Sequence, residues 1–246
     1  MKALIDADLI VYGVGFSTND LDQSLVPSRV DLTIQLILDA VKSEEHQLFI
    51  TMDGQDGFRY KVSPSYKGHR KQEKPVHYDF IRLYLIEKWG AKLCSHIEAD
   101  DAIGIEQDKN GCLEEAERYS YFTIICSLDK DLDMLCGMHY RWPIIRLGKE
   151  VSPSRFYCVE EPEATRWFYT QMLTGDTSDN IKGIDGIGPV KAKQILQDVD
   201  DEQEMFAIVR DMYNDDSRFL MNGKLLWIMR EVDDYWEKHF ERLNGN

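Results

Sequence analysis

Short apolar runs, each followed by an aspartate, recur along the chain. They are rich in β-branched, leucine and aromatic residues and are too short for helices, so they predict buried strands. Open α/β sheets bind their ligands beyond the carboxyl ends of the strands, which makes each following acid a candidate ligand. The runs and their acids are residues 3–5 with Asp6, 46–52 with Asp53, and 121–126 with Asp129.

Stretches with apolar residues at helical spacing separate these runs and predict helices. Two further apolar runs predict additional strands. We expect an α/β protein in which helices cover the faces of a mostly parallel sheet. The predicted helices span residues 31–42, 76–89, 159–173 and 223–240, and the additional strands span residues 91–97 and 142–147.

Composition narrows the class of protein. The 246 residues are 43% hydrophobic, enough for a real core, and no apolar run is long enough for a signal peptide or a membrane span. A soluble, cytoplasmic protein without a membrane partner is therefore expected. Five cysteines without a Cys-x-x-Cys pair indicate reduced thiols rather than disulfides or zinc ligands. The net charge of -15 argues against non-specific binding of nucleic acid.

The segment from Arg59 to Lys74 departs from this acidic background. It holds six basic residues against one acid, Glu73, and aromatic residues lie between them. Pro64 and Pro75 argue against continuous helix, so the segment predicts a mobile loop or arch that contacts backbone phosphates and stacks on bases. A solvated surface loop is the alternative. The basic residues are Arg59, Lys61, Lys67, Arg70, Lys71 and Lys74, and the aromatic residues include Tyr60 and Tyr66.

Two more acidic motifs follow predicted strands. In Glu98-Ala99-Asp100-Asp101 three acids open a predicted helix, where they either stabilise the helix dipole or add oxygen ligands at a third strand end. Asp129 and Asp131 face the same side if their segment is extended, so they can converge on neighbouring ions.

A further pair of acids lies in Gly175-Asp176-Thr177-Ser178-Asp179-Asn180. On a helical turn, residues three apart share a face, so the carboxylates of Asp176 and Asp179 could grip one hard divalent cation. The alternative is that one of them only caps a helix.

The motif Gly186-Ile187-Gly188-Pro189 predicts a tight turn that feeds a helix running to Leu196. The backbone N–H groups at the start of that helix, its dipole, and the charges of Lys191 and Lys193 would form a cradle for phosphate. An ordinary loop before a helix is the alternative, since glycine turns are common. The combination of this motif with the Gly-Asp-x-x-Asp-Asn segment directly before it, however, is quite specific, unlike a glycine turn alone.

Together these motifs resemble the flap endonuclease and 5′-3′ exonuclease family, which includes phage exonucleases and the N-terminal nuclease domain of bacterial DNA polymerase I. The resemblance covers residues 3–196 in the family's motif order. It implies a PIN-like, resolvase-like sheet within residues 1–172, with an arch at 57–75, and a helix-three-turn-helix that holds duplex DNA within residues 173–246. It also implies a monomer acting on DNA with a 5′ end or flap beside duplex, with RNA–DNA hybrid as a further candidate substrate.

The resemblance also implies roles for single residues. Tyr66-Lys67-Gly68-His69-Arg70 matches the Tyr-Lys-x-x-Arg motif of the family, whose Lys and Arg contact the scissile phosphate. Lys67 and Arg70 are therefore the implied electrophilic stabilisers in catalysis. A monovalent cation is implied at the helix-three-turn-helix. The candidate DNA contacts are Tyr66, Lys71, Lys74, Gly186, Gly188, Lys191 and Lys193.

Nine carboxylates complete the predicted site. Like charges gathered in low dielectric repel unless cations neutralise them, and oxygen ligands without His or Cys indicate Mg²⁺, with Mn²⁺ as a substitute, rather than zinc. Two ions about 4 Å apart could activate a water and stabilise the leaving oxygen of a phosphodiester. The family hydrolyses this bond with the same residue types and without a covalent intermediate. The nine are Asp6, Asp53, Glu98, Asp100, Asp101, Asp129, Asp131, Asp176 and Asp179.

Two other functions fit parts of the sequence. Asp6-Ala7-Asp8 and the Gly175–Asn180 segment resemble the nucleophile motif and the last metal motif of haloacid-dehalogenase-like phosphatases. That hypothesis leaves the Glu98–Asp101 motif unexplained and expects Gly-Thr where the chain has Leu9-Ile10. A non-catalytic DNA-binding module has no use for nine acids. The sequence therefore favours a 5′-3′ exonuclease or flap endonuclease.

Overall fold

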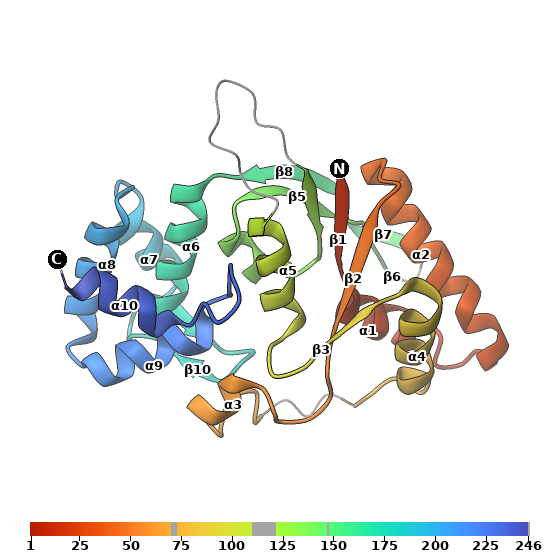
Figure 1. Ribbon diagram of the computed structural model, residues 1–246, viewed down its shortest axis with the longest axis horizontal. Coiled ribbons are helices and arrows are strands. Elements are labelled where there is room, and N and C mark those ends of the chain that lie inside the picture. Colours follow the sequence, from red (N-terminus) through yellow and green to blue (C-terminus); the bar gives the residue numbers. More distant parts are fainter. Residues whose placement is uncertain (70–72, 110–121, 147, 246) are drawn as a thin grey trace. The chain divides into compact units, whose positions relative to one another are not determined.

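The computed structural model describes residues 1–69, 73–109, 122–146 and 148–245. Two compact units make up the chain (Figure 1). None of the described helices is long and apolar enough to cross a membrane. Unit 1 contains Met1–Asp53, Gln72–Leu132 and Gly137–Cys158, and unit 2 contains Gly54–Lys71, Asp133–Cys136 and Val159–Asn246.

Unit 1 is built around a six-stranded sheet with the strand order β3-β2-β1-β4-β5-β8. The pairings of β1 with β2 and β4, of β2 with β3, and of β4 with β5 are parallel, which confirms the predicted sheet. The strand order reverses between β1 and β4, and sheets of this kind bind ligands at such a switch point. The strands are β1 (Lys2–Asp6), β2 (His46–Thr51), β3 (Lys92–Cys94), β4 (Thr123–Cys126), β5 (Gly137–Arg141) and β8 (Arg155–Val159).

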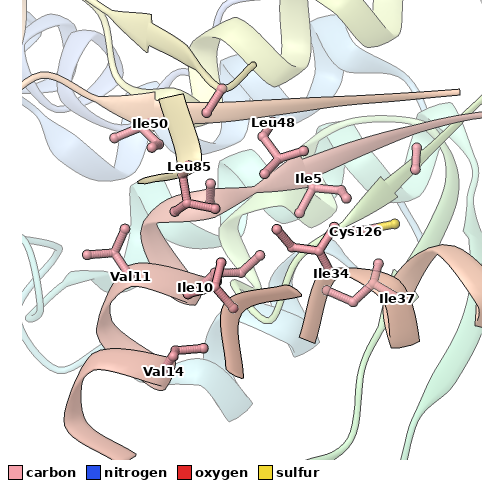
Figure 2. Packing of buried hydrophobic residues seen from close by; sticks show 14 of the residues in the cluster. Ile5, Ile10, Val11, Val14, Ile34, Ile37, Leu48, Ile50, Leu85 and Cys126 are labelled. Carbon is pink, nitrogen blue, oxygen red and sulfur yellow. The ribbon is translucent and has the colours of Figure 1, made fainter. Parts of the chain in front are cut away.

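Three helices cover one face of this sheet. Side chains alternate across a strand, so Ile5 and Leu48 point to this face and join one buried cluster with Ile34 of α2 and Leu85 of α4 (Figure 2). Burying a side chain of this size stabilises a fold by about 1.5–3 kcal/mol. Asp6, next to Ile5, points to the opposite face. The elements on this side are α1 (Ala7–Ser17), the 3-10 helix η1 (Gln23–Leu25), α2 (Val26–Val41) and α4 (Tyr78–Trp89).

Helix α5 (Ala99–Lys109) covers the opposite face, where it packs against β1, β2 and β4 (Figure 1). The 3-10 helix η2 (Asp131–Met134) follows β4. After β5, the strands β6 (Ile144–Arg146) and β7 (Lys149–Ser152) form a separate antiparallel pair. The carboxyl edge of the main sheet therefore lies beside the start of α5.

Unit 2 is helical, with an aromatic core. The Phe168 ring lies 5.1 Å from the Trp227 ring and 4.6 Å from the Trp236 ring, measured between centroids, and all three are buried. Buried aromatic side chains of this size dominate the energetics of a small core. The elements are α3 (Phe58–Val62), α6 (Glu161–Thr174), β9 (Gly175–Asp176), β10 (Ile181–Lys182), α7 (Pro189–Leu196), α8 (Glu202–Tyr213), α9 (Asp216–Leu226) and α10 (Trp236–Asn244).

The predicted helix over residues 223–240 is wrong, because the chain leaves the helix at Trp227 and re-enters one only at Trp236. The cause is a buried carboxylate. Asp234, 3% exposed, accepts hydrogen bonds from Trp227 Nε1 at 3.1 Å and from the Arg230 N–H at 2.9 Å. These bonds tie the intervening segment into a folded loop.

The two units divide the chain differently from the predicted boundary at residues 172 and 173. Unit 2 also contains helix α6 and the segment Gly54–Lys71. That segment is anchored by Arg59, which is 4% exposed and donates to the carbonyl oxygens of Leu225 (2.9 Å) and Trp227 (2.6 Å). A predicted phosphate-contacting residue is therefore part of the core of unit 2.

Candidate metal and nucleic-acid site

A chain of hydrogen bonds joins the carboxyl ends of β1 and β4 at the switch point of the sheet. Asp6 is 4% exposed, and its Oδ2 accepts a 2.8 Å hydrogen bond from the Ser127 hydroxyl. The Asp129 N–H donates to Ser127 Oγ over 3.0 Å. Parallel pairing places Ile5 in register with Cys126, so the residues that follow each of them meet. Asp6 and Asp129, predicted from separate runs, therefore lie at one edge.

The segment after β4 turns instead of continuing as an extended strand. The Asp131 N–H donates a 2.9 Å hydrogen bond to Asp129 Oδ1, and Asp131 begins the 3-10 helix η2. The prediction that the segment from Asp129 to Asp131 is extended is therefore wrong, because the Asp129 carboxylate closes a turn there. The Asp131 carboxylate also pairs with Lys130 Nζ at 3.4 Å.

Burial and neighbouring charges raise the pKa values of two carboxylates at this edge, Asp6 and Asp8. Burial, together with the charges of Asp8 and Asp129, raises the pKa of Asp6 to about 7, against the lowering effect of the Ser127 hydroxyl. Burial and the charge of Glu98 also raise the pKa of Asp8. The Arg82 guanidinium, 3.7 Å from Asp8, offsets part of the repulsion among these four acids, and the rest is costly without a further positive charge. An all-oxygen donor set of this kind fits a hard divalent cation.

Helix α5 begins at the same edge. The buried Asp101 carboxylate accepts a 3.0 Å hydrogen bond from the Glu98 N–H, the side-chain-to-backbone contact of a capping box. The Ala99 N–H donates to Thr51 Oγ1 at the end of β2 over 2.9 Å. Asp101 thus contributes to capping the helix, and its predicted role as a ligand stays a prediction. Glu98 and Asp100 in this motif are partly exposed.

Within residues 1–69, 73–109, 122–146 and 148–245, no three His, Cys, Asp or Glu side chains lie close enough together to hold one metal ion. Hydrogen bonds from the chain itself hold several of the acids, as described for Asp101 and Asp129. The set of nine metal ligands therefore stays a prediction.

Asp53 and Lys74, predicted as a metal ligand and a DNA contact, bind each other. Lys74 Nζ lies 2.6 Å from Asp53 Oδ2 and 4.1 Å from the centroid of the Tyr78 ring. The Tyr78 hydroxyl donates to Asp53 Oδ1 over 2.6 Å. These contacts lower the pKa of Asp53 despite partial burial. Both side chains of the ion pair remain about half exposed, at 52% for Lys74 and 46% for Asp53.

In unit 2, the acids of the Gly175–Asn180 segment do not lie on a helical turn, so that prediction is wrong. Asp176 belongs to the two-residue strand β9, which pairs antiparallel with β10. Its Oδ1 accepts from both the N–H and the hydroxyl of Ser178 at 2.6 Å, closing the turn between the strands. Local hydrogen bonding by Asp176 thus competes with helix formation.

The other acid of this segment organises the Tyr66–Lys67 motif. The Tyr66 hydroxyl donates to Asp179 Oδ2 at 2.9 Å, and the Lys67 N–H donates to the Asp179 carbonyl oxygen at 3.0 Å. Lys67 Nζ lies 3.8 Å from Asp179 Oδ2, and the Asn180 amide donates to the Ser65 carbonyl oxygen at 2.9 Å. Lys67 has a positive φ of 53°, an uncommon conformation for a lysine. Two candidate catalytic-site motifs, far apart in the sequence, thus hold each other in place.

As predicted, the described part of the basic segment is not helical throughout, and its mobility stays a prediction. It begins with helix α3, and the Tyr66 side chain is 2% exposed and packs against the Tyr60 ring at 5.4 Å. In this conformation the Tyr66 ring is buried and its hydroxyl binds the Asp179 carboxylate, and the predicted contact of Tyr66 with DNA stays a prediction. The predicted roles of Arg70 and Lys71 fall outside the described residues.

The glycine–proline turn feeds a helix as predicted. Gly188 is the N-cap of α7, Pro189 is its first residue, and no side chain caps it. Gly186 has a φ of 77°, which favours glycine, whereas Gly188 has a φ of -96° that any residue adopts. A Cβ on Gly188 would meet nothing within 4 Å. Internal structure therefore does not require glycine at 188, and the predicted approach of a phosphate to this backbone is consistent with it.

Two residues of the carboxylate edge were not predicted. Ser127 directly follows the apolar run that ends at Cys126, and a hydroxyl between a strand and an acid is a signal that could have marked it. Asp8, two residues after Asp6, is not among the nine predicted ligands. It accepts from the Thr51 N–H at 3.1 Å and lies 3.7 Å from the guanidinium of Arg82.

We expect Ser127→Ala to weaken metal binding at neutral pH. Its hydroxyl lowers the pKa of Asp6, so its loss raises that pKa further and leaves less carboxylate to bind a cation. A hydrogen bond to a charged group contributes about 1.5–3 kcal/mol, so the metal concentration for half-maximal activity at about pH 7 should rise about tenfold or more. The activity profile should also move to higher pH. Ser127→Thr, which keeps the hydroxyl, is the control, and an unchanged profile in Ser127→Ala would contradict this role.

No model of a known protein family matches the chain. Its sequence is similar to bacterial DNA polymerases I, with 26% identity over 231 residues to that of Bacillus caldotenax and 29% identity over 174 residues to that of Deinococcus radiodurans. The first alignment covers 85% of this chain and 24% of the polymerase, and the second covers 67% and 17%. The chain thus spans about a quarter or less of the length of these polymerases.

Solved structures of a bacteriophage T5 protein are similar to the chain over its whole length. One, co-crystallised with metal ions, has a TM-score of 0.65 at 16% identity and covers 99% of this chain and 96% of its own. Another, described as a T5 flap endonuclease complex with DNA and metal ions, has a TM-score of 0.64 at 16% identity and covers 99% and 98%. The chain therefore has the fold of the flap endonuclease and 5′-3′ exonuclease family that its motifs resemble.

Proposed function

We propose that this chain is a metal-dependent nuclease that hydrolyses DNA phosphodiester bonds as a 5′-3′ exonuclease or flap endonuclease. The observation that carries this proposal is the group of carboxylates Asp6, Asp8, Glu98 and Asp129 at the switch point of the sheet, where burial and neighbouring charges raise the pKa values of Asp6 and Asp8. The similarity to T5 structures that hold metal ions and DNA supports it.

Divalent metal ions supply the electrophilic and water-activating chemistry of this proposal. The T5 relatives hold metal ions, and one of them is described with zinc. We propose Mg²⁺ as the working ion, with Mn²⁺ as a substitute, because the donor set contains only oxygen. Asp6, Glu98 and Asp129 are the proposed ligands at the sheet edge, with Asp8 as an added candidate. The other proposed ligands are Asp53, Asp100, Asp101, Asp131, Asp176 and Asp179.

Lys67 is the proposed electrophile that stabilises negative charge on the scissile phosphate, together with Arg70. The Asp179 carboxylate, 3.8 Å from Lys67 Nζ, holds the ammonium group in place. The Tyr66 hydroxyl fixes the same carboxylate. Preorganised charge of this kind stabilises a transition state without reorganising during the reaction.

Duplex DNA is the proposed partner of the turn before α7. Gly188 and the exposed Lys191 and Lys193 present backbone N–H groups and positive charge at the start of this helix. The basic segment that contains Lys67 is the proposed contact for the single-stranded 5′ end or flap, so cleavage should proceed from the 5′ end.

The phosphatase hypothesis has less support. The second acid of its nucleophile motif would be Asp8, whose carboxylate instead accepts from the Thr51 N–H and lies near the Arg82 guanidinium. Incubation with DNA and with a small phosphate ester, each in Mg²⁺ and in EDTA, separates the two functions. Release of nucleotides from DNA in Mg²⁺ alone supports the nuclease, and release of phosphate only from the ester would overturn it.

We expect Mg²⁺ to raise the melting temperature more at about pH 8 than at about pH 5. The pKa of Asp6 is raised to about 7 from 3.8, so in the metal-free protein this group costs stability as the pH rises through that range. A cation binds the ionised cluster and offsets this cost. At about 100 times its dissociation constant it adds about 2.7 kcal/mol. Melting curves in Mg²⁺ and EDTA at both pH values test this, and curves indifferent to the metal would contradict a clustered site.

We expect Gly188→Val to lower duplex affinity about tenfold while the melting temperature stays unchanged, because the side chain points into open space where a phosphate would approach. Turnover at saturating DNA should change less. Gly186→Ala is the matched comparison, since its φ of 77° makes any side chain cost about 1 kcal/mol of stability. Binding titrations and melting curves of both variants test this, and parental DNA affinity in Gly188→Val would mean that the turn is only structural.

A further inference from the structure

Helix α2 exposes a row of leucines on the side that faces away from the sheet. Leu32 is 50% exposed and Leu36 is 58% exposed, and Leu25, at the N-cap of the helix, is 52% exposed. Single exposed leucines are ordinary, but three aligned on one helix face form a patch that indicates a partner. The side of α2 that packs on the sheet consists of Val26, Val30, Ile34, Ile37, Leu38 and Val41.

The exposed row has the spacing of a coiled-coil seam. Leu25, Arg29, Leu32, Leu36 and Asp39 follow one another at intervals of four, three, four and three residues, and all five are exposed. This alternation places them at successive a and d positions of a heptad pattern, which line the contact between two packed helices. The charged members lie on either side of the leucine pair, with Arg29 before it and Asp39 after it.

We propose that α2 pairs with α2 of a second copy of this chain in an antiparallel arrangement about a two-fold axis near residue 34. In this register Leu32 packs against Leu36 of the second copy, and Leu36 against its Leu32. The same register places Arg29 opposite Asp39 of the second copy, twice by symmetry. Such an isologous contact is the usual way in which identical chains form dimers.

Charge selects this arrangement over the parallel one. A parallel pair would place Arg29 against Arg29 and Asp39 against Asp39, which repel. Arg29 and Asp39 are both exposed, and Asp39 Oδ1 accepts a 2.8 Å hydrogen bond from Gln35 Nε2. The residues that flank the seam are uncharged, so they do not oppose it: Ser28, Thr33, Gln35 and Ala40.

The seam is short, and this sets the strength of the association. Two heptads bury less surface than the roughly 1,200–2,000 Å² of a stable interface, so the dimer is reversible and forms as the protein concentration rises. None of the predicted ligand or DNA-contact residues lies on this face of α2. A dimer of this kind is independent of the nuclease function, and it differs from the monomer that the family resemblance implies.

A charge swap on the full chain tests the proposal. Average mass is measured by light scattering over a wide range of protein concentration. Arg29→Asp alone and Asp39→Arg alone each create like-charge contacts and should weaken the dimer about tenfold or more. The double variant Arg29→Asp with Asp39→Arg restores opposite charges and should recover the dissociation constant of the parent. Leu36→Glu should leave only monomer.

Melting curves and nuclease activity at low protein concentration serve as controls, and both should match the parent in every variant because these residues are on the surface. A parent that stays monomeric at all concentrations would overturn the proposal. Association that survives Leu36→Glu would place the contact elsewhere and overturn it too. Failure of the double variant to recover association would refute the antiparallel register.

Discussion

Asp129→Asn should abolish cleavage in Mg²⁺, with a loss of about a thousandfold or more, while duplex binding stays largely intact. The reason is that catalysis and duplex binding depend on different units: we assign catalysis to the carboxylate edge of unit 1 and duplex binding to the turn before α7 in unit 2. Asparagine keeps the size of the side chain and can still accept from the Asp131 N–H, so the fold should persist. Single-turnover cleavage and duplex binding are measured side by side. Partial rescue by high Mn²⁺ is compatible with a ligand role.

Asp20→Asn is the matched control, because Asp20 is an exposed acid of unit 1 outside the carboxylate edge. It should retain the activity of the parent. Asp176→Asn, in unit 2, should behave like Asp129→Asn. Parental rates in either Asp129→Asn or Asp176→Asn would refute the assignment of these acids to metal binding.

Lys67→Ala should slow the chemical step about 10²–10³-fold, with a smaller loss of DNA binding. The ammonium group stabilises the charge that develops on the phosphate, so its effect is larger in the transition state than in the bound substrate. Removing it also leaves the Asp179 carboxylate without the lysine 3.8 Å away, which adds negative charge close to the substrate. Single-turnover rates at saturating DNA measure the chemical step directly.

Lys67→Arg and Lys61→Ala are the controls for this result. Lys67→Arg keeps the charge and should recover part of the rate. Lys61 is an exposed lysine of helix α3, and its loss should affect binding at low salt more than the chemical step. A Lys67→Ala enzyme as fast as the parent in single turnover would rule out the electrophilic role.

The strands could be predicted because the signal is local. Residues 3–5 are apolar and followed by Asp6, and the largely apolar residues 123–126 are followed by Ser127 and then Asp129, so burial of either run as a strand follows from the run itself. The break between α9 and α10 could not be predicted in this way. Apolar residues at 225–229 fit a helix equally well, and contacts made by the buried Asp234 decide against it.

The residues of the candidate site also differ in how far the sequence alone could place them. Asp6 and Asp129 could be placed together because the parallel sheet brings strand ends to one edge. The contact of Tyr66 with Asp179 joins residues 113 apart in the sequence, and no periodicity indicates it. The contacts of Arg59 could not be predicted either. The basic composition of its segment suggested a phosphate contact, but its guanidinium donates to carbonyl groups of unit 2.

The polarity and the metal dependence of cleavage together test the proposed nuclease activity. A duplex with a 5′ flap is labelled at either the 5′ or the 3′ end of the flap strand and incubated with the parent and with Asp129→Asn, in Mg²⁺ and in EDTA. We expect the parent to release short products from the 5′ label early, and only in Mg²⁺. Preferential loss of the 3′ label, or cleavage that persists in EDTA or in Asp129→Asn, would contradict this proposal.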